Sequence, residues 1–178
     1  MAERVYTPYT LTARVLHWLT AAMVLTMLPA GIIMANIGDG ALKDLLFHYH
    51  RSLGVLIMPV MIVRLIYRLT HRPPPLPADI PAIQQLGAEA VHFTLYGLLI
   101  IQPLVGWVAT SAYPAPILVA GLFELPPIWP PDRALSDLAF AVHRGIGIFI
   151  AVLLIGHIGA ALQHHFVRRD GVLMRMVG

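Results

Sequence analysis

One stretch, Leu138-Ala-Phe-Ala-Val-His-Arg-Gly-Ile-Gly-Ile-Phe-Ile-Ala-Val-Leu-Leu-Ile-Gly-His157, decides the fold of this chain. Its ionisable side chains are His143, Arg144 and His157, and every other residue is apolar or glycine. At about 1.5 Å per residue, a helix of this length crosses the roughly 30 Å of hydrocarbon in a bilayer. A segment in lipid must satisfy its own backbone hydrogen bonds, so we expect a transmembrane helix here.

Three further stretches have the same character, and we predict helices over about residues 11–37, 45–69, 85–112 and 138–167. Hydrophobic residues make up 58% of the chain and charged residues 12%. A domain facing water needs far more polar surface, which excludes a soluble fold and makes the lipid bilayer the surrounding solvent. We therefore predict one all-α domain over residues 1–178, a transmembrane four-helix bundle. No internal repeat is evident, and nothing points to a nucleic-acid partner.

Basic residues predict the orientation in the membrane. Four spans place both termini and the second connection on one side, and that side carries the larger number of basic residues. Because such residues are enriched on the cytoplasmic side, we expect both termini in the cytoplasm. The arginines on this side are Arg4, Arg14, Arg64, Arg68, Arg72, Arg168, Arg169 and Arg175, against Lys43, Arg51, Arg133 and Arg144 on the other. The proline-rich connection from Tyr113 to Asp137 is expected to lie along the membrane surface, with Trp129 at the headgroup level.

Histidines within the spans are the main functional signal. An ionisable side chain in a membrane span is costly, so a function is the default interpretation. The alternative is a neutral histidine hydrogen-bonded to a neighbouring helix. His143 and His157 are 14 residues apart, which places them on the same helix face about 21 Å apart along the axis. This spacing suits two large cofactors stacked across one bilayer.

Depth in the membrane gives each of these histidines a partner. His17 lies near the cytoplasmic end of the first span, as does His157 of the fourth, whereas His50 and His143 both lie near the opposite face. Each pair can hold an iron ion from two sides. Two axial imidazoles leave no open coordination position, which favours electron transfer over oxygen chemistry. The chain has no cysteine, which excludes iron–sulfur clusters and covalently attached c-type haem.

The choice between His48 and His50 depends on the helix register. The two residues point to opposite sides of the helix because they are two positions apart. Gly54 follows His50 by four residues, lies on the same face, and would let a flat macrocycle approach. We therefore favour His50 as the ligand and His48 as a residue of the membrane interface, an assignment that reverses if the register differs.

Two further groups of residues surround the histidine pairs. At the cytoplasmic end, His92, Tyr96 and His164 predict a quinone site, because histidines can exchange protons there. Contacts to haem propionates or lipid headgroups are the alternative for these residues. At the opposite face, Lys43, Arg51 and Arg144 could attract an anionic electron donor. These cations could equally pair with haem propionates.

In combination, these residues resemble the bacterial cytochrome b561 family. The resemblance rests on Arg14-Val-Leu-His-Trp18, His50-Arg-Ser-Leu-Gly54, Arg64-Leu-Ile-Tyr-Arg-Leu69, His92 with Tyr96, His143 with His157, Gln163-His-His-Phe166 and Leu173-Met-Arg-Met176. It implies two haem b groups, one ligated by His17 with His157 and the other by His50 with His143. It also implies an enzyme of the bacterial inner membrane that passes electrons from superoxide at the outer face to ubiquinone.

Two other functions remain open from the sequence. The first is an electron conduit docked to a dehydrogenase or a soluble cytochrome. The second is a histidine-rich transporter of divalent metals. A transporter should carry carboxylates within its spans, whereas nearly every Asp and Glu here falls in a connection or at a helix end.

Overall fold

The structure, a computed structural model, describes residues 7–75 and 79–178. Four long helices account for most of the chain, and each is long and apolar enough to cross a membrane. They are α1 (Leu11–Asn36), α2 (Ala41–Thr70), α3 (Ala82–Ala112) and α4 (Arg133–Gln163). The predicted four-helix transmembrane fold is thus confirmed. Arg4, which entered the orientation argument, lies outside the described residues.

Helices α2, α3 and α4 begin a few residues before the predicted apolar stretches, and side chains cap the first turns of α1 and α4. The Thr10 hydroxyl accepts a hydrogen bond from the Ala13 amide at 3.3 Å, and the Asp132 carboxylate accepts one from the Leu135 amide at 3.0 Å. Such caps satisfy amide groups that have no partner within the helix. Hydropathy alone does not detect them, so α4 begins at Arg133 rather than near residue 138.

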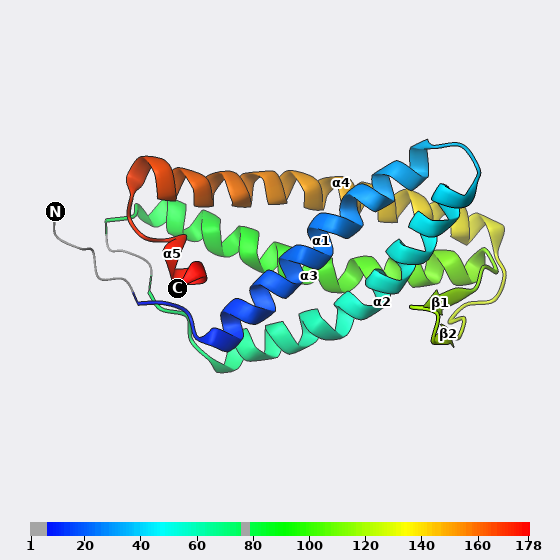
Figure 1. Ribbon diagram of the computed structural model, residues 1–178, viewed down its shortest axis with the longest axis horizontal. Helices are drawn as coiled ribbons and strands as arrows, with labels where there is room; N and C mark the ends of the chain where they lie inside the picture. The colour runs from blue at the N-terminus through cyan, green and yellow to red at the C-terminus, as the bar shows by residue number, and fades with distance from the viewer. Residues whose placement is uncertain (1–6, 76–78) are drawn as a thin grey trace.

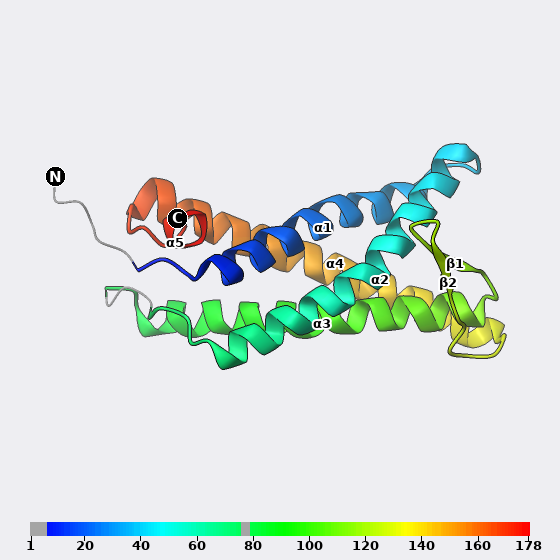
Figure 2. The same cartoon turned by 60° about the horizontal axis from the view of Figure 1, so that its bottom comes forward.

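The helices run up and down along the long axis of the molecule, with α1 crossing the others obliquely (Figures 1 and 2). The start of α1, the α2–α3 connection and the short helix α5 (Met174–Val177) lie at one end, called here the tail end. The α1–α2 turn and the strands β1 (Ile117–Val119) and β2 (Phe123–Leu125) lie at the other, called the strand end. This topology brings distant parts of the chain together at each end.

A small apolar core lies between the helices, with contributions from all four. Its buried members are Met23, Val24, Ile57, Met61, Leu95, Leu99 and Ile150. Many other apolar side chains face outward, among them Ile155, which is 74% exposed. An apolar exterior around a small core is the pattern expected of a bundle in lipid.

The connection between α3 and α4 contains structure that the sequence did not predict. Strands β1 and β2 pair antiparallel, with Ile117 opposite Leu125. The hairpin packs against α2, where the Ser52 hydroxyl donates to the Leu118 carbonyl at 3.1 Å and accepts from the Ala120 amide at 3.0 Å. The connection therefore folds back over α2 at the strand end.

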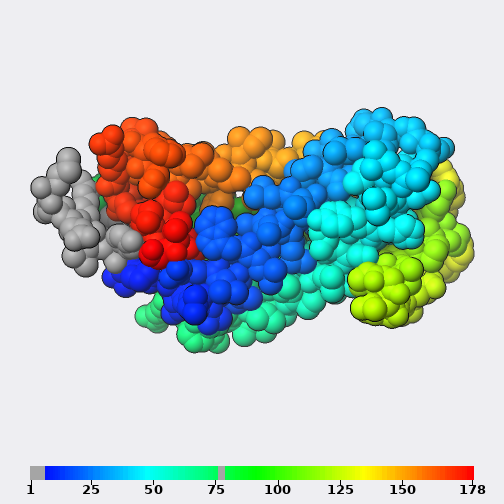
Figure 3. Space-filling model, viewed as in Figure 1, coloured from blue at the N-terminus to red at the C-terminus, as the bar shows by residue number. Residues whose placement is uncertain are grey.

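The C-terminal segment also departs from the predicted helix over residues 138–167. Helix α4 ends at Gln163 and is followed by a π-helical turn, His164–Arg168, and by Arg169 in the left-handed conformation with φ of 52°. The chain then returns to pack α5 against the start of α1 (Figure 3). The Arg14 guanidinium donates to the Val177 carbonyl and the Trp18 indole to the Met176 carbonyl.

Candidate functional site

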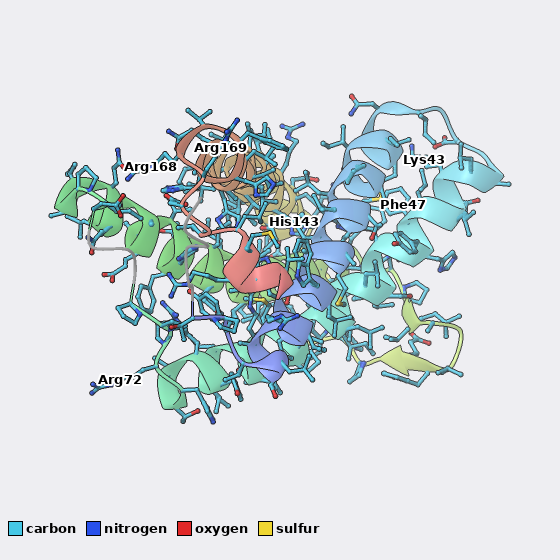
Figure 4. All side chains as sticks on the ribbon, turned by 60° about the vertical axis from the view of Figure 1, so that its left-hand side comes forward. Lys43, Phe47, Arg72, His143, Arg168 and Arg169 are labelled. Carbon is cyan, nitrogen blue, oxygen red and sulfur yellow. The ribbon has the colours of Figure 1, made fainter. Side chains whose placement is uncertain are left out.

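Helices α2 and α4 bring His50 and His143 together near the strand end. Their ring centroids are 6.0 Å apart, and Figure 4 shows His143 among the helices. The Nδ1 atom of His50 lies 3.0 Å from the Met27 carbonyl oxygen, and that of His143 lies 3.2 Å from the Gln102 carbonyl oxygen. A carbonyl can only accept, so each Nδ1 carries the proton and donates it. The Nε2 atom of each ring therefore keeps its lone pair for a metal.

This geometry suits an iron atom between the two rings. Metal–nitrogen bonds of about 2 Å place opposite nitrogens about 4 Å apart, and the ring radii bring the centroids to roughly 6 Å. Histidines that bind metals commonly donate their other ring N–H to a carbonyl, which fixes the tautomer and the ring orientation. Both features are present here. Gly54 adds space, since no atom lies within 4 Å of the position that a Cβ would occupy.

The tail end has a second pair, between His17 of α1 and His157 of α4. Their ring centroids are 6.2 Å apart, which also suits an intervening iron atom. His92 of α3 lies closer to His157, at 5.2 Å. That separation is shorter than the roughly 6 Å that an intervening iron atom requires. The residues present can thus hold a haem group at each end, with His17 the better partner for His157.

Arg64 occupies the centre of the tail-end site. Its Nη2 atom donates to Nδ1 of His17 at 2.7 Å, and its guanidinium lies 5.2 Å from the centre of the Tyr96 ring. Because arginine only donates, Nδ1 of His17 is the accepting nitrogen and the ring proton is on Nε2. Coordination of iron through Nε2 therefore requires Arg64 to release His17. A haem propionate carries the charge that could draw the guanidinium away.

The residues predicted for a quinone fall into two groups. His92 and Tyr96 lie beside the tail-end histidine pair on α3. His164 begins the π-helical turn, and within the described residues no hydrogen bond or ring contact joins it to His92 or Tyr96. Its Nδ1 atom instead lies 2.5 Å from the Asp170 carboxylate. The predicted quinone residues therefore do not form one contiguous contact group among the described residues.

Asp170 is a site residue that the sequence did not reveal. Its side chain is 1% exposed, and it also accepts from the Nε atom of Arg168 at 3.2 Å. Burial acts to raise the pKa of this carboxyl group, but hydrogen bonds from His164 and the Val172 amide, with the charge of Arg168, hold the pKa below its ordinary value. A buried carboxylate therefore orients His164. The sequence does not indicate this contact, because an aspartate six residues after a histidine is not a recognisable motif. The contact depends on the left-handed conformation of Arg169, which lies between the two residues.

The cations at the strand end differ in how far they are already paired. Lys43, labelled at that end in Figure 4, makes an ion pair with Asp39 at 2.9 Å. The Arg51 guanidinium donates to the Pro116 carbonyl at 2.7 Å. Arg144 is exposed and has no hydrogen bond or ion pair within the part of the chain that the structure describes. Of the three predicted cations, Arg144 is therefore the one without a hydrogen-bond or ion-pair partner among the described residues.

The other predicted assignments can be placed as well. His48 is exposed, whereas His50 is partly buried and faces His143. Among the residues that the structure describes, no three His, Asp or Glu side chains converge as a site for a metal ion. In the described part of the chain the histidines instead form opposed pairs, an arrangement that could hold haem.

Sequence comparisons identify a family and several relatives of this chain. The family model described as prokaryotic cytochrome b561 matches residues 8–178. Cytochrome b561 homolog 2 of Escherichia coli (strain K12) is 33% identical, over 96% of this chain and 91% of that protein. Cytochrome b561 homolog 1 of the same organism is 30% identical, over 91% and 92%.

A third relative carries a more specific description. The probable superoxide oxidase CybB of Yersinia pestis is 26% identical, over 91% of each chain. The match of the family model along almost the whole chain, with four membrane-spanning helices and paired histidines, settles the classification. This chain belongs to the prokaryotic cytochrome b561 family, whose members are membrane electron-transfer proteins that bind haem b.

Proposed function

We propose that this protein is a di-haem superoxide:ubiquinone oxidoreductase of the bacterial inner membrane. One observation carries the di-haem part of the proposal: two histidine pairs, His50 with His143 and His17 with His157, have ring centroids 6.0 and 6.2 Å apart at opposite ends of the bundle. The choice of superoxide as donor is supported by the likeness to the probable superoxide oxidase of Yersinia pestis. Each pair would hold one haem b through its two imidazoles. When bound, these groups supply one-electron carriers at two depths of the membrane.

The reaction balances with two equivalents of the donor. Two superoxide anions each give up one electron and leave as dioxygen. One ubiquinone takes up the two electrons together with two protons and leaves as ubiquinol. The protein has to admit a small anion at one end, deliver protons at the other, and keep the two sites apart.

The strand end is the proposed entry for superoxide. Arg144 follows the ligand His143 directly and has no partner among the described residues, so it can attract an anion. Lys43 and Arg51 contribute less, because Asp39 and the Pro116 carbonyl already engage them. The donor needs to reach only the edge of a haem group, so two axial imidazoles do not obstruct the reaction.

The tail end is the proposed ubiquinone site. His92 and Tyr96 border the histidine pair, and His164 is held by the buried carboxylate of Asp170. An Asp–His pair can pass a proton to a bound quinone and recover one from water, because an imidazole held by a carboxylate can both donate and accept a proton. With the tail end and its arginines in the cytoplasm, these protons come from the cytoplasmic side.

Ubiquinol formation in proteoliposomes tests the proposal. Vesicles containing the purified protein and ubiquinone should form ubiquinol when superoxide is generated outside, and His143→Ala should abolish the reaction. His48→Ala is the matched control, since His48 is an exposed histidine near the same end. If wild-type protein with two haem groups forms no ubiquinol faster than empty vesicles, superoxide is not the donor. An electron conduit docked to another protein then takes its place.

A further inference from the structure

The two halves of the chain repeat one pattern of residues. In α1, His17 is followed by Met27 and Gly31, and in α3, His92 is followed at the same spacings by Gln102 and Gly106. In both helices these spacings are ten and fourteen residues. The equality is not visible as a repeat in the sequence, because the residues between these positions differ.

Helices α2 and α4 repeat in the same way. His50-Arg-Ser-Leu-Gly54 in α2 corresponds to His143-Arg-Gly-Ile-Gly147 in α4. Seven residues after each histidine lies a fully buried isoleucine, Ile57 at 0% and Ile150 at 2% exposure. The buried Val24 and Leu99 correspond in α1 and α3. The α1–α2 hairpin and the α3–α4 hairpin are therefore two copies of one unit.

The contact between the helices of each unit is also repeated. His50 of α2 donates to the carbonyl of Met27, and the glycine four residues later, Gly31, lies against its ring. His143 of α4 donates to the carbonyl of Gln102, and Gly106 lies against its ring. A Cβ atom built on Gly31 would stand 2.9 Å from Cε1 of His50, and one built on Gly106 would stand 3.0 Å from Cε1 of His143. An alanine at either position would force the adjacent imidazole ring to shift from the place it occupies.

We propose that these two carbonyl–glycine receptacles, Met27 with Gly31 and Gln102 with Gly106, are a duplicated device that positions both imidazoles of the strand-end haem. The carbonyl fixes the tautomer of the ring, and the absent side chain of the glycine lets the Cε1 edge of the ring approach the neighbouring helix. Gly31 and Gly106 are positioning residues that act through His50 and His143. The inference rests on the proposed haem ligation at this end.

The repeat also explains the asymmetry of the tail end. His92 is the counterpart of His17, and Arg64 is the counterpart of His157. Each unit thus places two corresponding side chains at the tail end. The first unit contributes His17 and Arg64, and the second contributes His92 and His157, so that three of the four are histidines and one is an arginine. The iron-compatible pair, His17 with His157, takes one histidine from each unit.

Glycine-to-alanine variants of the full-length holoprotein test the receptacle. Gly31→Ala and Gly106→Ala should each displace a ring, so that the strand-end haem is lost or its low-spin signal in electron paramagnetic resonance shifts, while the tail-end signal stays. The two variants should change the same signal. Gly145→Ala is the matched control, because Gly145 is exposed on α4, two residues from His143, with open space around it.

The readouts separate this inference from the proposed function. Wild-type protein with fewer than two haem groups per chain would overturn the proposed function itself. Two haem groups in wild type, with either glycine variant indistinguishable from Gly145→Ala, would overturn only the receptacle. If the variants do not accumulate, ¹⁵N-histidine spectra of reduced wild-type protein serve instead. They should show protonated Nδ1 atoms on His50 and His143, and unprotonated ones would refute the proposed carbonyl contacts.

Discussion

His17, and not His92, is expected to be the partner of His157, and alanine substitutions distinguish the two. The centroid of the His17 ring lies 6.2 Å from that of His157, whereas the centroid of the His92 ring lies 5.2 Å away. Two metal–nitrogen bonds of about 2 Å, with the ring radii, require roughly 6 Å. The His92 ring is about 1 Å closer than this, so a shared iron atom would require one of these two rings to move away from the other.

The expected result follows from this difference. His17→Ala and His157→Ala should each reduce the haem content from two groups per chain to one and remove the same step from a redox titration. His92→Ala should keep both groups and both steps. Haem is counted by the pyridine haemochrome assay in purified protein, with His48→Ala as the control for loss of a histidine. Loss of one haem group in His92→Ala, with both kept in His17→Ala, would refute the assignment.

Three further predictions concern the two ends of the bundle. Asp170→Asn should keep both haem groups but slow ubiquinol formation several-fold. Because the pKa of Asp170 is depressed in the folded protein, its charge stabilises the fold above the ordinary carboxyl pKa of about 4, and this contribution is lost as pH falls through the depressed value. A melting temperature with the same acid dependence in wild type and Asp170→Asn would contradict this. Arg175→Ala should lower the free energy of unfolding by roughly 3 kcal/mol, because the Thr7 and Pro74 carbonyls lose the buried guanidinium that donates to them. An unchanged thermal transition in detergent would contradict this prediction. Arg144→Gln should lower the superoxide-driven rate several-fold and flatten its dependence on salt, with a smaller effect for Lys43→Gln; equal effects would show that the ion pair of Lys43 with Asp39 does not persist.

The fold follows from hydropathy because lipid leaves few alternatives. Four apolar stretches of sufficient length must be helices, and short connections force neighbouring helices to run antiparallel. Depth alone then brings His50 close to His143, since α2 and α4 enter from the same end. The choice of His50 over His48 used the helical period together with Gly54 on the same face, and His48 is exposed in the structure.

The features that the sequence did not reveal depend on contacts between distant residues. The bond of His164 to Asp170 needs the π-helical turn and the left-handed Arg169, and neither has a sequence signal. Arg51 looked available because it follows His50 directly, but the α3–α4 connection folds back and places the Pro116 carbonyl against it. The repeat of the α1–α2 hairpin in the α3–α4 hairpin is not evident from the sequence, because the two hairpins carry corresponding residues only at the paired histidines, the glycines beside them and a few core positions.

The form of the strand end bears on the choice between a small donor and a protein donor. A redox partner protein needs a surface of several hundred Å² with complementary charge. Here the β1–β2 hairpin presents Leu122 at 82% and Phe123 at 53% exposure, and Trp129 lies in the same connection at 48%. Side chains of this kind belong at the level of lipid headgroups, where they would hold the hairpin against the membrane. Most of the nearby cations are already engaged, which leaves Arg144 as a single point of attraction. One accessible cation beside a ligand histidine suits a small anion far better than a docked protein, and this favours superoxide over the conduit.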